Sequence, residues 1–156
     1  MIFQHISIKV KIMEIIVKTF QQLTTEELYE ILKIRCAVFI VEQNCPYQDI
    51  DDTDKTALHI FLKDEKGAII SYLRLFEKDA ATAHIGRVLT MQRGKGHGNT
   101  VLKAGIKAAE EIMCKKQIYL EAQSYATGFY EKEGFAVVGE EFLEDGIPHK
   151  PMMYIF

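Results

Sequence analysis

The sequence predicts an α+β domain built on a mixed central sheet with helices on its faces. Three observations support this class: strand-like segments are grouped before the main helix, a strand–helix–strand stretch follows, and a glycine-rich loop joins a strand directly to that helix. A doubly wound parallel sheet would need a stricter alternation of strands and helices. The chain of 156 residues, 48% of them apolar, is long enough for one domain with a self-sufficient core.

The first strand is expected at Ile15–Phe20, within the run MEIIVKTF that begins at Met13. Residues 1–12 are therefore expected to be an N-terminal extension, with the domain over residues 13–156. Residues 6–12 alternate apolar and polar side chains, so an extra edge strand is the alternative interpretation of this segment.

The first helix is expected to begin after Thr24, because Glu27 completes a capping box with that residue. Apolar residues continue along one face of the helix to about Glu42, unless a kink divides the segment. Pro46 and the polar stretch DIDDTD, residues 49–54, then predict a loop.

The middle of the chain predicts three strands followed by the main helix. Leu58–Lys63 and Ala68–Glu77 are rich in β-forming residues, and the glycine of the intervening DEKG suits a hairpin turn. Thr82–Leu89 is the third strand, and it leads into the loop QRGKGHGNT. Apolar residues from Val101 to Met113 recur at the spacing of a helix.

The C-terminal part of the chain predicts further strands around a short helix. Ile118–Ala122 has the pattern of a strand, and Tyr125–Lys132 that of a helix ended by Gly134. Phe135–Gly139 is expected to be another strand, with which the tail Met152–Phe156 could pair.

The charge balance and the cysteines exclude several classes of protein. Nineteen basic and 22 acidic residues give a net charge of −3 with no block of like charge, which argues against a nucleic-acid partner. The three cysteines cannot all pair and show no CxxC spacing, so a reducing cytoplasm is the simplest location. No apolar stretch is long enough for a signal peptide or a membrane span, so no membrane partner is expected.

No metal site is expected either. The acidic residues from Asp49 to Asp54 lack the glycine and the glutamate that an EF-hand requires, and the five histidines show no HxxxH spacing. The carboxylates of this loop could instead attract a cationic amine, although a solvated loop is the favoured interpretation.

The glycine-rich loop RGKGHG, Arg93 to Gly98, has the composition of an anion site. Its backbone N–H groups, the positive end of the following helix and two cationic side chains suit a phosphate or pyrophosphate. The spacing does not match the GxGxxG of dinucleotide-binding proteins, and no Gly-Lys-Ser or Gly-Lys-Thr of a nucleotide P-loop occurs.

The same loop resembles the R-x-x-G-x-G signature of the GNAT superfamily of acyl-CoA-dependent N-acetyltransferases. A second segment, Gln123 to Phe135, is similar to the family motif N-x-x-A-x-x-F-Y-x-x-x-G-F, with Gln123 in place of Asn. Within the superfamily the chain resembles the ElaA-like group in four further stretches: RCAVFIVEQ from Arg35, NCPYQDID from Asn44, IGRV from Ile85 and EDGIPH from Glu144.

The resemblance implies a mostly antiparallel sheet that is splayed between its fourth and fifth core strands, with acetyl-CoA as co-substrate in the gap. The segment between the fourth strand and the loop arginine is a couple of residues shorter than is usual in the family. The implied cofactor-binding residues are Val88, Leu89, Thr90, Arg93, Gly94, Lys95, Gly96, His97, Gly98, Asn99, Thr100, Gln123 and Tyr130.

The resemblance also implies catalytic roles. The backbone N–H near Leu89 is the candidate donor to the developing oxyanion, and Tyr130 the candidate general acid. Glu42, Glu121 and His149 are the candidates for the general base. Glu42 lies seven residues after Arg35, so the two could form an ion pair in the acceptor pocket or a solvated surface pair.

The sequence therefore favours an enzyme that transfers an acetyl group from acetyl-CoA to a primary amine in a ternary complex. The acceptor could be a small molecule or an amine of a peptide or protein, and a homodimer is an open alternative for the assembly. A non-catalytic CoA-binding sensor or regulatory module is the alternative function. A generic nucleotide-phosphate module is disfavoured by the loop spacing.

Overall fold

The computed structural model describes residues 12–156, and most of the predicted extension lies outside the described residues. Within these described residues, eight strands form one sheet in the order β1-β2-β3-β4-β5-β8-β6, with β7 paired to β8. Their bounds are β1 Glu14–Thr19, β2 Leu58–Lys63, β3 Ile69–Glu77, β4 Thr82–Thr90, β5 Gln117–Gln123, β6 Ala136–Val137, β7 Phe142–Glu144 and β8 Ile147–Ile155.

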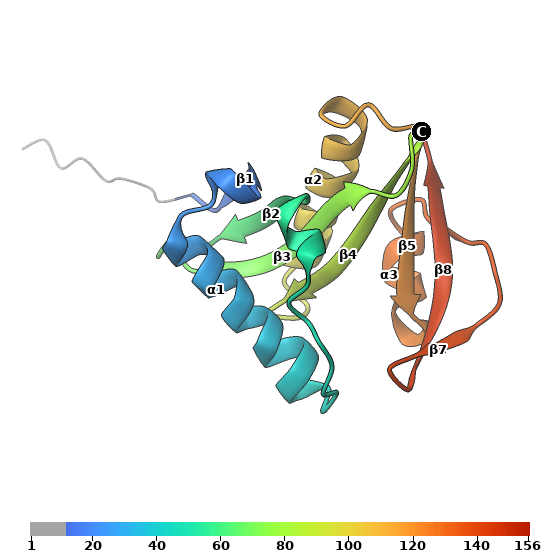
Figure 1. Ribbon diagram of the computed structural model, residues 1–156, viewed down its shortest axis with the longest axis horizontal. Helices are drawn as coiled ribbons and strands as arrows, with labels where there is room; N and C mark the ends of the chain where they lie inside the picture. The colour runs from blue at the N-terminus through green and yellow to red at the C-terminus, as the bar shows by residue number, and fades with distance from the viewer. Residues whose placement is uncertain (1–11) are drawn as a thin grey trace, which may run out of the picture.

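The sheet is split between β4 and β5. These two strands pair in parallel only where Thr82–His84 meets Gln117–Tyr119, whereas every other pairing is antiparallel. Beyond His84 the two strands diverge, so that β5, β8 and β7 swing away from the rest of the sheet (Figure 1). The mixed, mostly antiparallel and splayed sheet predicted from the sequence is confirmed.

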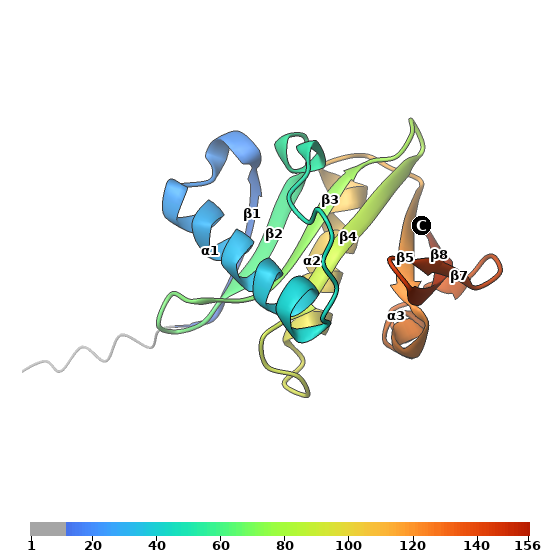
Figure 2. The same cartoon turned by 60° about the horizontal axis from the view of Figure 1, so that its bottom comes forward.

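The helical segments cover both faces of the sheet. Figure 2 shows α1 in front of the strands and α2 behind them. The bounds are η1 Phe20–Gln22, α1 Thr25–Arg35, η2 Cys36–Glu42, η3 Asp52–Lys55, α2 His97–Glu111, η4 Ser124–Ala126 and α3 Thr127–Glu131.

Each face of the sheet has its own apolar core. On the α2 side, Val101 and Leu102 pack with Leu73 and Ile85. On the α1 side, Ile31 lies in a second cluster with side chains of β2 and β3. No helix in residues 12–156 has both the length and the apolar character that crossing a bilayer would require.

Four segments differ in extent or type from the sequence prediction. The first helix keeps α-helical bonding only to Arg35 and continues as the π-helical η2, and the predicted loop contains the short 3-10 helix η3. The strand predicted at 135–139 is reduced to β6. The tail does pair with β6, but as part of the longer β8.

The hairpin β7–β8 was absent from the prediction although its turn has a sequence signal. Asp145 and Gly146 have φ of 49° and 76°, as the two central residues of a type I′ turn require, and Asp-Gly is a preferred pair there. The prolines at positions 148 and 151 obscured the strand, because proline lacks the N–H that a sheet normally uses.

Glu27 joins the start of α1 to the edge of the sheet. Its carboxylate accepts hydrogen bonds from Lys18 Nζ at 2.8 Å and Lys63 Nζ at 3.0 Å, and it also closes the predicted capping box with Thr24. Burial alone would raise the pKa of Glu27, but these hydrogen bonds outweigh it and lower the pKa from 4.5 to about 2.

We therefore expect Glu27→Gln to lower the free energy of unfolding by about 2 kcal/mol at pH 7. Because the folded-state pKa is depressed, this contribution is complete above pH 4.5 and is lost as the pH falls toward 2. Urea unfolding at pH 7, 5 and 3 should show the difference between the two proteins shrinking below pH 4.5. Glu26→Gln, at an exposed position, is the control, and an equal effect there would contradict the prediction.

Candidate active site

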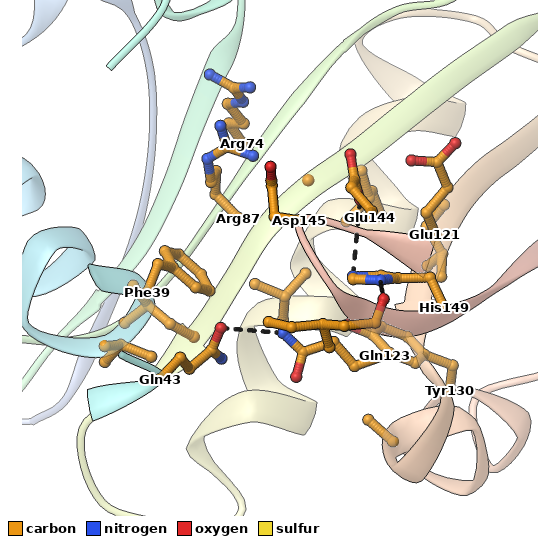
Figure 3. Close-up of a pocket in the computed structure, with 18 of the residues that line it drawn as sticks. Phe39, Gln43, Arg74, Arg87, Glu121, Gln123, Tyr130, Glu144, Asp145 and His149 are labelled. Carbon is orange, nitrogen blue, oxygen red and sulfur yellow. Dashed lines mark hydrogen bonds and ion pairs between the residues drawn. The ribbon is translucent and has the colours of Figure 1, made fainter. Parts of the chain in front are cut away.

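A cavity of about 670 Å³ lies where β4 and β5 separate (Figure 3). Its walls come from β4 and β5, the end of η2, the short helix α3 and the β7–β8 turn. Gln43 and Gln123 close one side of it through a hydrogen bond of 3.1 Å from Nε2 of Gln123 to Oε1 of Gln43. The split in the sheet thus produces a cavity between the two groups of strands.

The glycine loop meets this cavity at the N-terminus of α2. Gly94 and Gly96 have φ of 76° and 77°, in the region that glycine tolerates, and open space surrounds the position of a Cβ at each. The first backbone bond of the helix is donated by Thr100 N–H to the Gly96 carbonyl oxygen at 3.1 Å. The N–H groups of Gly98 and Asn99 precede that bond and have no partner within the helix.

The charged and polar residues of the loop have different surroundings. Arg93 is exposed and forms an ion pair with Glu42, the last residue of η2. His97 is buried, and its Nδ1 has no hydrogen-bond partner in the described chain. Asn99 donates to Glu133 at 3.0 Å, so its side chain joins α2 to the end of α3. Lys95 is exposed at the tip of the loop.

A β-bulge deforms β4 beside the cavity. Tyr72 pairs with Leu89 and Arg74 with Gly86, so β4 contains one residue more than β3 in this interval. Arg87 in the bulge has φ of 55°, a left-handed conformation that is unusual for a residue other than glycine. Val88, Leu89 and Thr90, three of the predicted cofactor residues, follow the bulge and line the cavity.

The bulge determines which amide faces the gap. Met91 N–H donates to the Ile70 carbonyl at 2.8 Å, and two residues earlier Leu89 is opposite Tyr72. Because antiparallel bonding alternates, the N–H of Leu89 points toward β3 and that of Val88 points away from it. The amide available for an oxyanion is therefore the one of Val88, next to the predicted position.

Tyr130 enters the cavity from α3. Its ring is buried and packs edge-on against Phe129 and Phe135, with centroids 4.9 Å and 6.0 Å away. Burial raises the pKa of the Tyr130 hydroxyl above its ordinary value of 10, so the group keeps its proton at neutral pH. A protonated phenol in this position can act as a hydrogen-bond or proton donor.

Two of the three candidate bases line the cavity. Glu121 accepts a hydrogen bond from the Tyr119 hydroxyl at 3.0 Å. His149 is buried, with Nδ1 2.7 Å from the carbonyl oxygen of Ile147. Because a carbonyl only accepts, Nδ1 must be the protonated nitrogen whenever the ring is neutral, which leaves Nε2 as the proton acceptor. Nε2 lies 3.7 Å from Oε2 of Glu144, which also lines the cavity (Figure 3). Glu42 lies outside the cavity lining, where it faces the loop arginine.

The predicted pair between Arg35 and Glu42 is wrong. The seven-residue spacing places two side chains on one face only in an α-helix, whereas the intervening segment is π-helical and turns the chain differently. Arg35 is instead fully buried and donates to Asp49 at 3.0 Å and to Asp54 at 2.7 Å.

Three aspartates of the acidic loop, Asp49, Asp51 and Asp54, belong to a largely buried ion-pair network, which corrects the expectation of a solvated loop for these residues. Asp52 is exposed and pairs with Lys55. Arg74 donates to Asp51 at 2.6 Å and to Asp54 at 2.8 Å. Arg87 donates from Nε to Asp49 at 2.7 Å, so three arginines face three aspartates. The network is neutral overall, and Asp51, Arg74 and Arg87 also line the cavity.

Sequence reasoning missed Arg74 and His84 as cavity residues. His84 lies between two aromatic rings, stacked on Phe76 at 4.6 Å and edge-on to Tyr119 at 5.2 Å. Burial lowers its pKa to about 4, so the ring is neutral at pH 7. The alternation of side chains along a strand could have identified both residues. His84 and Gly86 lie on the same face of β4, and Arg74 lies opposite Gly86 on the neighbouring strand β3.

The described residues contain no group of three or more His, Cys, Asp or Glu side chains placed to hold a metal ion. What the arrangement does offer is a set of amides and glycines for an anion, an amide beside a bulge, a protonated tyrosine and a histidine whose Nε2 faces Glu144. These groups come from both halves of the split sheet and meet at one cavity.

Comparison with known sequences gives one family. The sequence profile of the acetyltransferase (GNAT) domain matches residues 19–156. The protein ElaA of Escherichia coli is 39% identical over 134 residues, which cover 82% of this chain and 87% of ElaA. The UPF0039 protein Rv2851c of Mycobacterium tuberculosis is 40% identical over 140 residues, which cover 85% of this chain and 87% of that protein.

Comparison with solved structures gives the same family. The crystal structure of Escherichia coli ElaA superposes with a TM-score of 0.85 at 35% identity, over 92% of this chain and 99% of ElaA. That of an acyl-CoA N-acyltransferase from Pseudomonas aeruginosa has a TM-score of 0.84 at 35% identity, over 91% and 99% of the two chains.

Proposed function

Because the chain belongs to the GNAT acetyltransferase family and resembles its ElaA-like members, we propose that it transfers the acetyl group of acetyl-CoA directly to a primary amine while both substrates are bound. The observation that carries this proposal is the cavity at the β4–β5 split, which joins the glycine loop to Tyr130 and to the amide of Val88. The acceptor is a small-molecule amine or an amine of a peptide or protein.

The residues present fit acetyl-CoA as the co-substrate. Open space around Gly94 and Gly96 allows a pyrophosphate to approach the backbone, and the unpaired amides of Gly98 and Asn99 are donors for it. In the part of the chain that the structure describes, the edge of β4 beyond His84 has no strand partner on the β5 side, and it could pair with the amide groups of the pantetheine arm. When bound, acetyl-CoA would supply the acyl group as a reactive thioester.

We assign three roles to groups of the chain itself. The N–H of Val88 stabilises the negative charge that develops on the carbonyl oxygen. The hydroxyl of Tyr130 supplies a proton to the departing thiolate. His149 accepts the proton of the amine at Nε2, with Glu121 as the second candidate on the same wall. Binding both substrates in one cavity supplies much of the rate through proximity.

Thiol release tests this proposal. Acetyl-CoA is mixed with the protein and a panel of amines: an aliphatic diamine, an amino sugar, a peptide with a free N-terminus and a lysine-containing peptide. Thiol release that depends on both protein and amine is the expected result. CoA binding by calorimetry without release from any amine would favour the sensor or regulatory module. Displacement of CoA by equal concentrations of ATP would favour a generic nucleotide-phosphate module.

The contact between α2 and α3 is expected to control CoA affinity. A Cβ at Gly98 would lie only 3.3 Å from the ring of Phe129, so Gly98→Val should push the start of α2 away from α3. We expect the Kd for CoA to rise about tenfold, measured by calorimetry. Gly128→Val is the control, since its Cβ meets nothing within 4 Å, and equal affinities of the two variants would contradict this assignment.

A further inference from the structure

Arg87 connects the buried ion-pair network to the bulge of β4. Its guanidinium lies on the network, while its own backbone forms the bulge that precedes Val88. We propose that Arg87 is a positioning residue, whose side chain, anchored on Asp49 and Asp51, holds the bulge in the conformation that turns the Val88 N–H into the gap. This inference rests on the proposed acetyl transfer and assigns a function to the network.

The backbone of Arg87 needs an external restraint. Its φ of 55° lies in the left-handed region, where the Cβ of an L-residue crowds the carbonyl oxygen, and arginine has no short polar side chain to offset this locally. Such a conformation persists in a strand only when surrounding contacts hold it. If Arg87 relaxed to ordinary β geometry, the strand could pair regularly and the alternation of amides would shift at Val88.

The contacts of the Arg87 side chain provide that restraint. Nε donates to Asp49 Oδ1 at 2.7 Å, and one terminal nitrogen donates to the Asp49 carbonyl oxygen at 3.2 Å. The same nitrogen is 3.6 Å from Asp51 Oδ2, and the guanidinium lies over the ring of Tyr47 at 5.3 Å. Figure 3 shows Arg87 and Arg74 together above the cavity. The guanidinium is thus held from three sides.

The two aspartates that hold Arg87, Asp49 and Asp51, are themselves fixed, because each of their carboxylate oxygens accepts a hydrogen bond from another residue. Asp49 is buried and also accepts hydrogen bonds from Arg35 at 3.0 Å and from the Tyr47 hydroxyl at 2.9 Å. Asp51 is held by both terminal nitrogens of Arg74, at 2.6 Å and 2.9 Å. Hydrogen bonds between ionised groups in buried surroundings are stronger than neutral ones and fix geometry well.

This role accounts for three motifs that the transfer chemistry leaves unexplained. The three stretches lie far apart in the sequence. One begins with RC at Arg35, the second contains QDID at residues 48–51, and the third is IGRV at residues 85–88. In the structure their charged residues meet in the network that ends at the bulge. Because the backbone of Arg87 forms the bulge, the network reaches Val88 through the backbone of β4, in addition to the three side chains, of Asp51, Arg74 and Arg87, that line the cavity.

The test compares three substitutions of Arg87. Arg87→Ala removes the anchor and leaves a residue that resists positive φ, so we expect kcat to fall about 100-fold, as on loss of an oxyanion donor. Arg87→Gly removes the anchor but tolerates positive φ, and Arg87→Lys keeps one cationic contact. The kcat of each of these two variants should therefore be about tenfold higher than that of Arg87→Ala. The Kd for CoA should change less than twofold in all three, because the glycine loop is untouched.

Cys114 supplies a matched control for backbone strain. It has φ of 53° and is exposed in the loop after α2, outside the cavity lining. Cys114→Ala and Cys114→Gly should therefore alter the melting temperature without altering kcat. A kcat for Arg87→Ala within threefold of the original protein, or a loss of kcat that follows melting temperature equally at both positions, would overturn the proposal.

A crystal structure of Arg87→Ala decides the inference separately from the proposed function. Loss of the positive φ and of the register shift between β3 and β4 is the expected result, and a bulge that persists unchanged would overturn the inference whatever the kinetics show. If the original protein transfers acetyl to no amine, the proposed function fails, while this structure still reports whether Arg87 holds the bulge.

Discussion

Arg35→Met is expected to lower the free energy of unfolding by about 3–5 kcal/mol. Arg35 is fully buried and donates to Asp49 and Asp54. Methionine would fill much of the volume of the arginine side chain, but each of these two buried carboxylates would lose one of its positively charged partners. Removing one partner of a buried ion pair costs more than the pair contributes, because the remaining charge is desolvated without compensation. Asp54 would keep only its bond from Arg74.

Urea unfolding at pH 7 measures this effect, and a second methionine substitution on the same helix controls for it. Lys33 is two residues earlier in α1, with an exposed side chain that pairs with Glu30. Because exposed ion pairs contribute little, Lys33→Met should leave the free energy of unfolding nearly unchanged. Similar stabilities of the two variants would show that the network is not a stabilising element of the fold.

The sequence was informative wherever structure depends on neighbouring residues. The capping box of Thr24 and Glu27 forms as predicted, and the glycine loop does lie between β4 and the start of α2. These features depend on contacts three or four residues apart, which a pattern can encode directly. The strand grouping likewise predicted the class of sheet.

The sequence was uninformative where structure depends on contacts between distant segments. Arg35 lies 14 and 19 residues from its aspartate partners, and Arg87 lies 38 residues from Asp49. A charged residue in a helix or loop normally belongs to the surface, so composition alone favours solvation for the acidic loop. The π-helical turn after Arg35 also breaks the 3.6-residue period from which a shared face with Glu42 was predicted.

The groups proposed for the transfer and the groups of the ion-pair network approach the cavity from opposite faces of the sheet. Tyr130 comes from α3, which with α2 covers the face opposite α1, whereas the side chain of Arg74 belongs to the network that binds Arg35 of α1. A thioester in the gap would thus have the Tyr130 hydroxyl on one side and the cavity-lining groups of the network, Asp51, Arg74 and Arg87, on the other. The direct transfer that we propose requires an amine to approach the thioester without displacing CoA, and the network side is the side that Tyr130 leaves open to it.

Tyr130→Phe is expected to lower kcat about 100-fold with little change in the KM for acetyl-CoA. The ring and its packing against Phe129 and Phe135 remain, so only the hydroxyl is lost. Because burial holds the pKa of this hydroxyl above 10, the phenol remains protonated to at least pH 9, and its ionisation should not limit kcat of the original protein below pH 10. Steady-state thiol release from pH 6 to 10 measures both effects.

The control is Tyr154→Phe, which removes a hydroxyl from a partly buried ring that packs on Phe135 outside the cavity. It should leave kcat unchanged, so that a loss at Tyr130 alone reflects the proton and not the aromatic cluster. Full activity of Tyr130→Phe at every pH would exclude the hydroxyl as general acid and require the thiolate to take its proton from solvent. A loss of activity that disappears when a more acidic thiol ester replaces acetyl-CoA would support the role, since such a leaving group needs less protonation.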